Sequence, residues 1–157
     1  MKIMISIAAV FFTMSSYVSA QTPDRSRGQG YVFAAPGIGN YELGKPNIHI
    51  GIGGEGFIYR GLGIGAEIGG VGSDRVVGLG SANLSYHFFP RKTGDRLEPF
   101  VTAGYSLFFR AGLSGGYNAG GGFNLWLNKD LALRIEIRDQ HSHRFETVSF
   151  RIGVTFR

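Results

Sequence analysis

The residues best suited to chemistry in this sequence stand close together near its carboxyl end. Ser142 lies between His141 and His143, and Glu146 follows three residues after His143. A serine, a histidine and a carboxylate are the groups of an acyl-transfer site. Neighbouring residues of an extended segment point to opposite faces, however, so these groups are not expected to converge. We predict a polar loop tip from 140 to 146 without a catalytic residue, and two histidines without a third ligand make a poor metal site.

The composition restricts the class of protein. The chain of 157 residues has 26 glycines, no cysteine and a formal net charge of +5, and its length suits one domain. The lack of cysteine excludes a disulfide framework and a thiol nucleophile. The glycine run at 51–56 is not followed by a helical pattern, which a dinucleotide-binding turn requires, and the basic residues are dispersed rather than clustered. We therefore expect no cofactor and no nucleic-acid partner.

The first twenty residues have the pattern of a secretory signal peptide. Lys2 precedes an apolar run from 3 to 13, and small residues lead to Ala20, after which cleavage is expected. We predict a flexible leader from 21 to 29 and one folded domain from 30 to 157. Beyond the signal peptide no apolar run reaches 18 residues, which excludes a membrane-spanning helix on length.

Apolar and polar residues alternate along most of the remaining chain. From 147 to 156, every second residue is Val, Phe or Ile, and a period of two indicates a β-strand. The same alternation predicts eight strands, at 30–36, 47–58, 62–70, 80–89, 97–110, 117–127, 131–138 and 147–156. An even number of strands brings both ends of an up-and-down barrel to one side. On that side we expect turns at 59–61, 90–96 and 128–130, and at the other end loops at 37–46, 72–75, 111–116 and 140–146.

The polar faces of these strands distinguish a membrane barrel from a soluble one. In a soluble barrel of lipocalin type the apolar side chains point inward, whereas in a membrane barrel they meet lipid. The polar faces carry balanced charges, as a buried interior demands: Glu55, Glu67, Glu98 and Glu136 against Arg110, Arg134, Arg138 and Arg151. We predict an all-β fold, an eight-stranded antiparallel transmembrane β-barrel with this polar network in its lumen. A soluble barrel or sandwich is the alternative.

The last 42 residues carry a resemblance to a known class. The segment GYNAGGGFNLWLNKDLALRIEIRDQHSHRFETVSFRIGVTFR resembles the last three strands of small outer-membrane β-barrels, typified by the OmpA transmembrane domain and OmpX. Its ending resembles the assembly signal of Gram-negative outer-membrane proteins, with Phe150, Ile152, Val154 and Phe156 in alternation, although Arg157 follows the final aromatic residue. The resemblance implies residence among outer-membrane lipid and lipopolysaccharide, insertion by the barrel assembly machinery and passage with periplasmic chaperones.

Three functions are compatible with these patterns. The favoured one is a structural or interaction barrel, not an enzyme, whose narrow lumen is filled by side chains. A small channel for small or hydrophobic solutes is the first alternative, because glycines such as Gly63, Gly65 and Gly69 could leave gaps in the lumen. A lipid A-modifying enzyme is the second, because small outer-membrane barrels include such enzymes and because Ser142 lies between two histidines.

Overall fold

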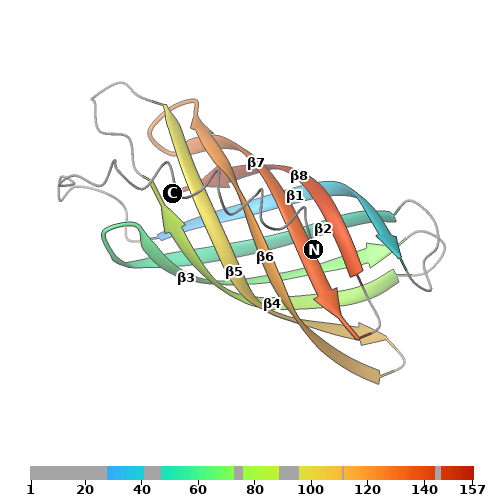
Figure 1. The fold of residues 1–157 in the computed structure, drawn as a ribbon. Coiled ribbons are helices and arrows are strands. Elements are labelled where there is room, and N and C mark those ends of the chain that lie inside the picture. Colours follow the sequence, from blue (N-terminus) through green and yellow to red (C-terminus); the bar gives the residue numbers. More distant parts are fainter. Residues whose placement is uncertain (1–27, 41–46, 73–75, 89–95, 111, 144–145) are drawn as a thin grey trace, which may run out of the picture.

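The chain forms a closed barrel of eight tilted strands (Figure 1). The computed structural model describes residues 28–40, 47–72, 76–88, 96–110, 112–143 and 146–157. Each strand pairs antiparallel with the next, and β8 closes the barrel on β1. The strands are β1 (Gly28–Asn40), β2 (Asn47–Tyr59), β3 (Leu62–Gly72), β4 (Val76–His87), β5 (Leu97–Arg110), β6 (Gly112–Trp126), β7 (Leu131–Ser142) and β8 (Glu146–Phe156). The predicted fold class is confirmed.

The two ends of the barrel are named here by what they hold. The terminus end holds the start of β1, the end of β8 and the connections β2–β3, β4–β5 and β6–β7, and the opposite loop end holds the other four connections. At the terminus end, Arg60 and Gly61 have positive φ angles of 36° and 93°, as a tight hairpin turn requires. In the turn between β6 and β7, the side chain of Asn128 accepts hydrogen bonds from the backbone N–H groups of Asp130 and Leu131, the usual role of asparagine in a turn.

Several boundaries differ from those expected. The predicted signal peptide and residues 21–27 of the leader lie outside the described residues, and β1 starts at Gly28, two residues before the expected strand. The loop expected at 111–116 is wrong, because β5 and β6 stay paired up to Arg110 and Gly112. Similarly, β7 continues to Ser142, so the loop expected at 140–146 is shorter.

The outer surface of the barrel is mostly apolar and its interior is mostly polar. In β8, Phe150 and Ile152 are 44% and 49% exposed, whereas Ser149 and Arg151 between them are at most 1% exposed. The same alternation holds in β2, whose isoleucines face outward and whose Glu55 faces inward. A soluble barrel would place these faces the other way round. The described part of the chain contains no helix that is long and apolar enough to cross a membrane.

Candidate functional site

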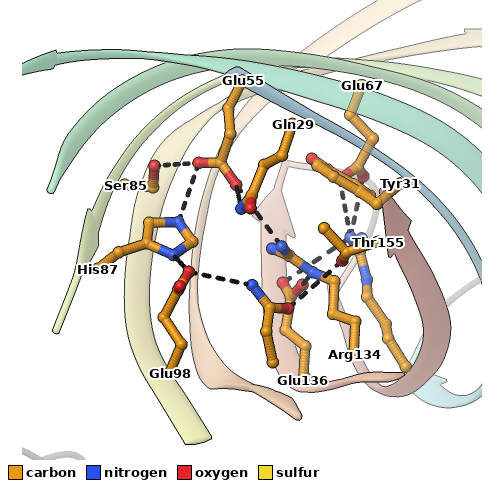
Figure 2. Close-up of polar contacts among 12 residues, drawn as sticks. Gln29, Tyr31, Glu55, Glu67, Ser85, His87, Glu98, Arg134, Glu136 and Thr155 are labelled. Carbon is orange, nitrogen blue, oxygen red and sulfur yellow. Dashed lines mark hydrogen bonds and ion pairs between the residues drawn. The ribbon is translucent and has the colours of Figure 1, made fainter. Parts of the chain in front are cut away.

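The candidate site is the polar interior of the barrel, here called the lumen network. It consists of inward side chains that strand alternation contributes from all eight strands, together with Arg157, which follows β8. Its members include Gln29, Tyr31, Glu55, Glu67, Ser85, His87, Glu98, Asn118, Asn124, Trp126, Arg134, Glu136, Arg138, Arg151 and Arg157. Figure 2 shows many of these side chains converging from opposite walls. The network has a cluster near the terminus end, a central cluster and an arginine that joins them.

The cluster near the terminus end is built around His87. Its Nδ1 atom lies 2.8 Å from Glu98 and its Nε2 atom lies 3.1 Å from Glu55 (Figure 2). An imidazole donates hydrogen bonds from both nitrogens only when it is protonated, so this arrangement suits a charged histidine between two carboxylates. The other oxygen of Glu55 accepts a hydrogen bond of 2.7 Å from the Gln29 amide, and the hydroxyl of Ser85 donates to Glu55 as well.

The central cluster consists of alternating carboxylates and guanidinium groups. Arg151 donates to both oxygens of Glu67, at 3.0 and 2.9 Å. Arg138 pairs with Glu136 and donates to the side-chain oxygen of Asn118 at 2.9 Å. Because removing two charges from water is costly, such a cluster persists only where each charge has close partners. The central cluster meets this condition.

Arg134 joins the two clusters. Its Nε atom donates to Glu136 at 3.1 Å, and its NH1 atom lies 3.6 Å from Glu55. The rings of Tyr31 and Phe100 flank its guanidinium group at 4.3 and 4.0 Å from the ring centres. Aromatic rings attract a guanidinium through their faces, so contacts with the two rings replace part of the hydration of the Arg134 guanidinium group. The charged interior is therefore continuous from Glu98 to Glu67.

Aromatic rings occupy the space beside the lumen glycines. A Cβ atom at Gly53 would lie 2.5 Å from the Tyr31 ring, and one at Gly51 would lie 2.6 Å from the Phe33 ring. Gly63, Gly65 and Gly69 are equally enclosed: a Cβ atom there would lie 2.6, 2.7 and 2.5 Å from other atoms. At Gly63, Gly65 and Gly69 these nearest atoms are the Ser85 hydroxyl and backbone oxygens of β2, so the backbone of each glycine lies close against its neighbours.

Toward the loop end the described lumen side chains are uncharged. One wall is an apolar cluster of Val71, Val77, Leu79 and Phe108. In the same layer, the buried side-chain amides of Asn47 and Gln140 have no hydrogen-bond partner among the described residues, and an unpaired buried amide costs free energy. The charged clusters, rather than this layer, must therefore provide most of the specific polar contacts in the lumen.

The structure places the predicted network residues inside the barrel, apart from Arg110, whose side chain lies outside the described part. The buried members are Glu55, Glu67, Glu98, Arg134, Glu136, Arg138 and Arg151. Sequence reasoning missed Tyr31, because β1 has the weakest alternation, and Gln29, because it was assigned to the leader. It also missed Arg157, which follows the last strand and carries no alternation signal. The positive charge of Arg157 was the one sequence feature that could have indicated its place in the lumen network.

The histidine and serine residues near the carboxyl end do not form a common site. Ser142 belongs to β7 and faces the lumen with 8% exposure. His141 faces outward, stacks on Tyr117 at 5.1 Å and lies 3.7 Å from Glu146. Because Ser142 and His141 point to opposite sides of the barrel wall, they cannot act together in acyl transfer. Among the described residues, no group of three His, Cys, Asp or Glu could hold a metal ion.

Comparison with known proteins identifies the fold. No protein-family model matches the chain, and no curated protein matches its sequence. The chain is similar to the solved structure of Neisserial surface protein A, with a TM-score of 0.70 and 15% identity over 85% of this chain and 99% of that one. It is also similar to the N-terminal β-barrel domain of OprF from Pseudomonas aeruginosa (TM-score 0.65, 15% identity, 85% and 98% covered) and to the outer membrane protein OprG from the same organism (0.54, 12%, 84% and 96%). The protein thus has the fold of the small outer-membrane β-barrels.

Proposed function

We propose that the protein is an integral β-barrel of the bacterial outer membrane with a closed lumen and a structural or interaction role. The observation that carries the proposal is the inverted arrangement of the barrel, with the ion-paired lumen network inside and an apolar surface outside. A narrow eight-stranded barrel has an interior that side chains can fill completely. Such a barrel presents its outer loops and its wall to partners without serving as a diffusion pore.

The outer surface supports the membrane location. Its isoleucines at 48, 50, 52, 64 and 68 are each more than half exposed, and a soluble monomer rarely shows so large an apolar surface. Aromatic side chains stand toward both ends of the strands, with Tyr59 and Tyr86 near the terminus end and Tyr117 nearer the loop end. Outer-membrane barrels carry such residues at the two membrane interfaces. In a membrane, lipid would therefore cover this apolar surface, whose exposure to water is unfavourable.

The route to the membrane follows from the resemblance of the sequence. Export by the signal peptide, with cleavage near Ala20, would leave the terminus end in the periplasm and the loop end outside. We propose that periplasmic chaperones carry the chain and that the barrel assembly machinery recognises the ending with Phe150, Ile152, Val154 and Phe156. Lipid and lipopolysaccharide would then surround the inserted barrel.

Heat modifiability and conductance test the proposal together. Protein extracted from outer membranes should migrate differently on semi-native gels before and after boiling, because a folded barrel resists detergent until it is heated. The same protein in planar bilayers should give no lasting open levels. Recovery from the soluble periplasmic fraction without a gel shift would contradict the membrane location, whereas a gel shift combined with lasting open levels would contradict the closed lumen alone.

A further inference from the structure

The side chain of the last residue turns into the barrel. The Arg157 side chain is 14% exposed, and its NH2 atom lies 2.9 Å from a carboxylate oxygen of Glu98. Its guanidinium carbon lies 3.8 Å from the centre of the Trp126 ring. Its backbone N–H donates a hydrogen bond of 3.0 Å to the carbonyl oxygen of Asp130. Three parts of the chain therefore hold this residue: β5, β6 and the turn between β6 and β7.

The preceding residue, Phe156, contacts the junction of β8 and β1 from the outer face of the barrel. Phe156 pairs with Gly30 of β1 and with Leu131 of β7, so it lies where the barrel closes. A Cβ atom at Gly30 would lie 2.5 Å from the Phe156 ring. The absence of a side chain at Gly30 thus leaves room for the ring, a recognised use of glycine within strands. The last two residues contact the closing strands from opposite faces of the wall.

We propose that Phe156 and Arg157 form a clasp that locks the closed barrel and seals the terminus end of its lumen. The outer half forms only when β1 pairs with β8, because Gly30 belongs to β1. The inner half forms only when β8 lies along β7, which brings Arg157 over Trp126 and Glu98.

The electrostatic part of the clasp concerns Glu98. This carboxylate is fully buried and also contacts His87 at 2.8 Å and the indole N–H of Trp126 at 3.0 Å. Arg157 adds a full positive charge and a charge-assisted hydrogen bond, which is stronger than a neutral one. The Trp126 ring shields the guanidinium group from water on one face. Loss of Arg157 would therefore both weaken the compensation of Glu98 and uncover Trp126.

The single tryptophan of the chain makes the clasp measurable. Trp126 is the only tryptophan in the sequence, so the intrinsic fluorescence of the refolded protein reports on the residue that Arg157 covers. We would compare wild type, Arg157→Ala and Arg157→Lys in lipid vesicles. Lys129→Ala is the matched control, because it removes an exposed cation from the adjacent turn. Arg157→Ala should shift the emission maximum and increase quenching by acrylamide, Arg157→Lys should do so less, and Lys129→Ala should match wild type.

A second readout tests the locking role. The temperature at which the folded gel band converts to the unfolded band should fall in Arg157→Ala and in Gly30→Ala. An emission spectrum and quenching identical to wild type in Arg157→Ala would overturn the clasp, as would an unchanged conversion temperature. If Arg157→Ala does not fold, the test uses Arg157→Lys and wild type. Acrylamide quenching of folded wild type as strong as that of the urea-unfolded chain would then overturn the seal. None of these readouts uses conductance, so their failure leaves the proposed closed barrel standing.

Discussion

Arg134 illustrates at the scale of one residue how the lumen holds charge without bulk water. Its guanidinium nitrogens approach the carboxylates of Glu136 and Glu55, and its central carbon lies 4.3 and 4.0 Å from the ring centres of Tyr31 and Phe100. A planar guanidinium can donate hydrogen bonds in its plane while it stacks above and below, which a lysine ammonium cannot do. The side chain thus serves both neighbouring clusters at once.

Removal of this side chain should be costly. We expect Arg134→Ala to lower the free energy of unfolding by about 3 to 5 kcal/mol, because it removes one partner of the buried carboxylates Glu136 and Glu55 and leaves their negative charge less compensated. Urea titration of the folded gel band in lipid vesicles measures the change. Arg134→Lys should lie between the Ala variant and wild type, because it keeps the charge and loses the stacking. Lys129→Ala, in an exposed turn, should stay within about 0.5 kcal/mol of wild type, and an equal effect at both positions would contradict this account.

Two adjacent glycines provide a matched test of the packing around the network. A Cβ atom at Gly53 would collide with the Tyr31 ring, whereas one at Gly54 would meet its nearest neighbour at 3.5 Å. We expect Gly53→Ala to lower the free energy of unfolding by about 1 to 3 kcal/mol through overpacking, and Gly54→Ala to have little effect. The same urea titration compares them. Equal losses at the two positions would show that glycine is needed there for the backbone rather than for the ring.

At the scale of the strand, the alternation of apolar and polar residues was sufficient to predict the position and facing of a strand whose two faces carry distinct residue types. From 131 to 137 in β7 and from 148 to 156 in β8 every second residue is apolar, and the structure places those residues outside and Arg134, Glu136 and Arg151 inside. A period of two fixes the facing of a strand, because a shift by one residue would exchange its two faces. The sequence therefore predicted the strands and the inward residues of this part of the barrel.

Prediction from sequence failed where glycine replaced side chains. The run at 112–116 looks like a loop, yet β6 continues through it because Tyr105 of β5 covers Gly115, where a Cβ atom would lie 2.0 Å from the tyrosine oxygen. In β1, small residues obscured the alternation that places Tyr31 and Phe33 inside. An aromatic ring on a neighbouring strand can fill the place of a missing side chain. Such compensation depends on register, which the sequence of one strand does not contain.

The facing of β8 can be tested by moving one charge along the strand. Ile152 stands in mid-strand and pairs with Ala34 and Ile135 on its two sides. We expect Ile152→Arg to lower the free energy of unfolding in lipid vesicles by about 2 to 4 kcal/mol, the cost of arginine near the bilayer midplane. Val148→Arg, closer to the loop end, should cost about 1 kcal/mol or less because the penalty falls with depth. Similar costs at the two positions would contradict the proposed position in the membrane.

At the scale of the whole molecule, closure of the lumen depends on two kinds of contact. The ion pairs cross the interior from β7 and β8 to β2, β3 and β5, whereas the rings of Tyr31 and Phe33 line the wall beside Gly53 and Gly51. Charged groups alone can hydrate and admit ions, because a polar lumen is also the interior of an aqueous porin. The rings should therefore decide whether the network is a plug or the lining of a channel.

This division of roles predicts a change in conductance. The double variant Tyr31→Ala with Phe33→Ala uncovers two glycines along one wall, so we expect it to give lasting open levels in planar bilayers where wild type gives none. Gel mobility before boiling verifies that the variant is folded. The control is Tyr105→Ala with Tyr117→Ala, which removes two rings from the outer surface and should remain silent. If the folded double variant at 31 and 33 also gives no conductance, the ion pairs rather than the rings close the lumen, because the buried charges alone would then exclude ions.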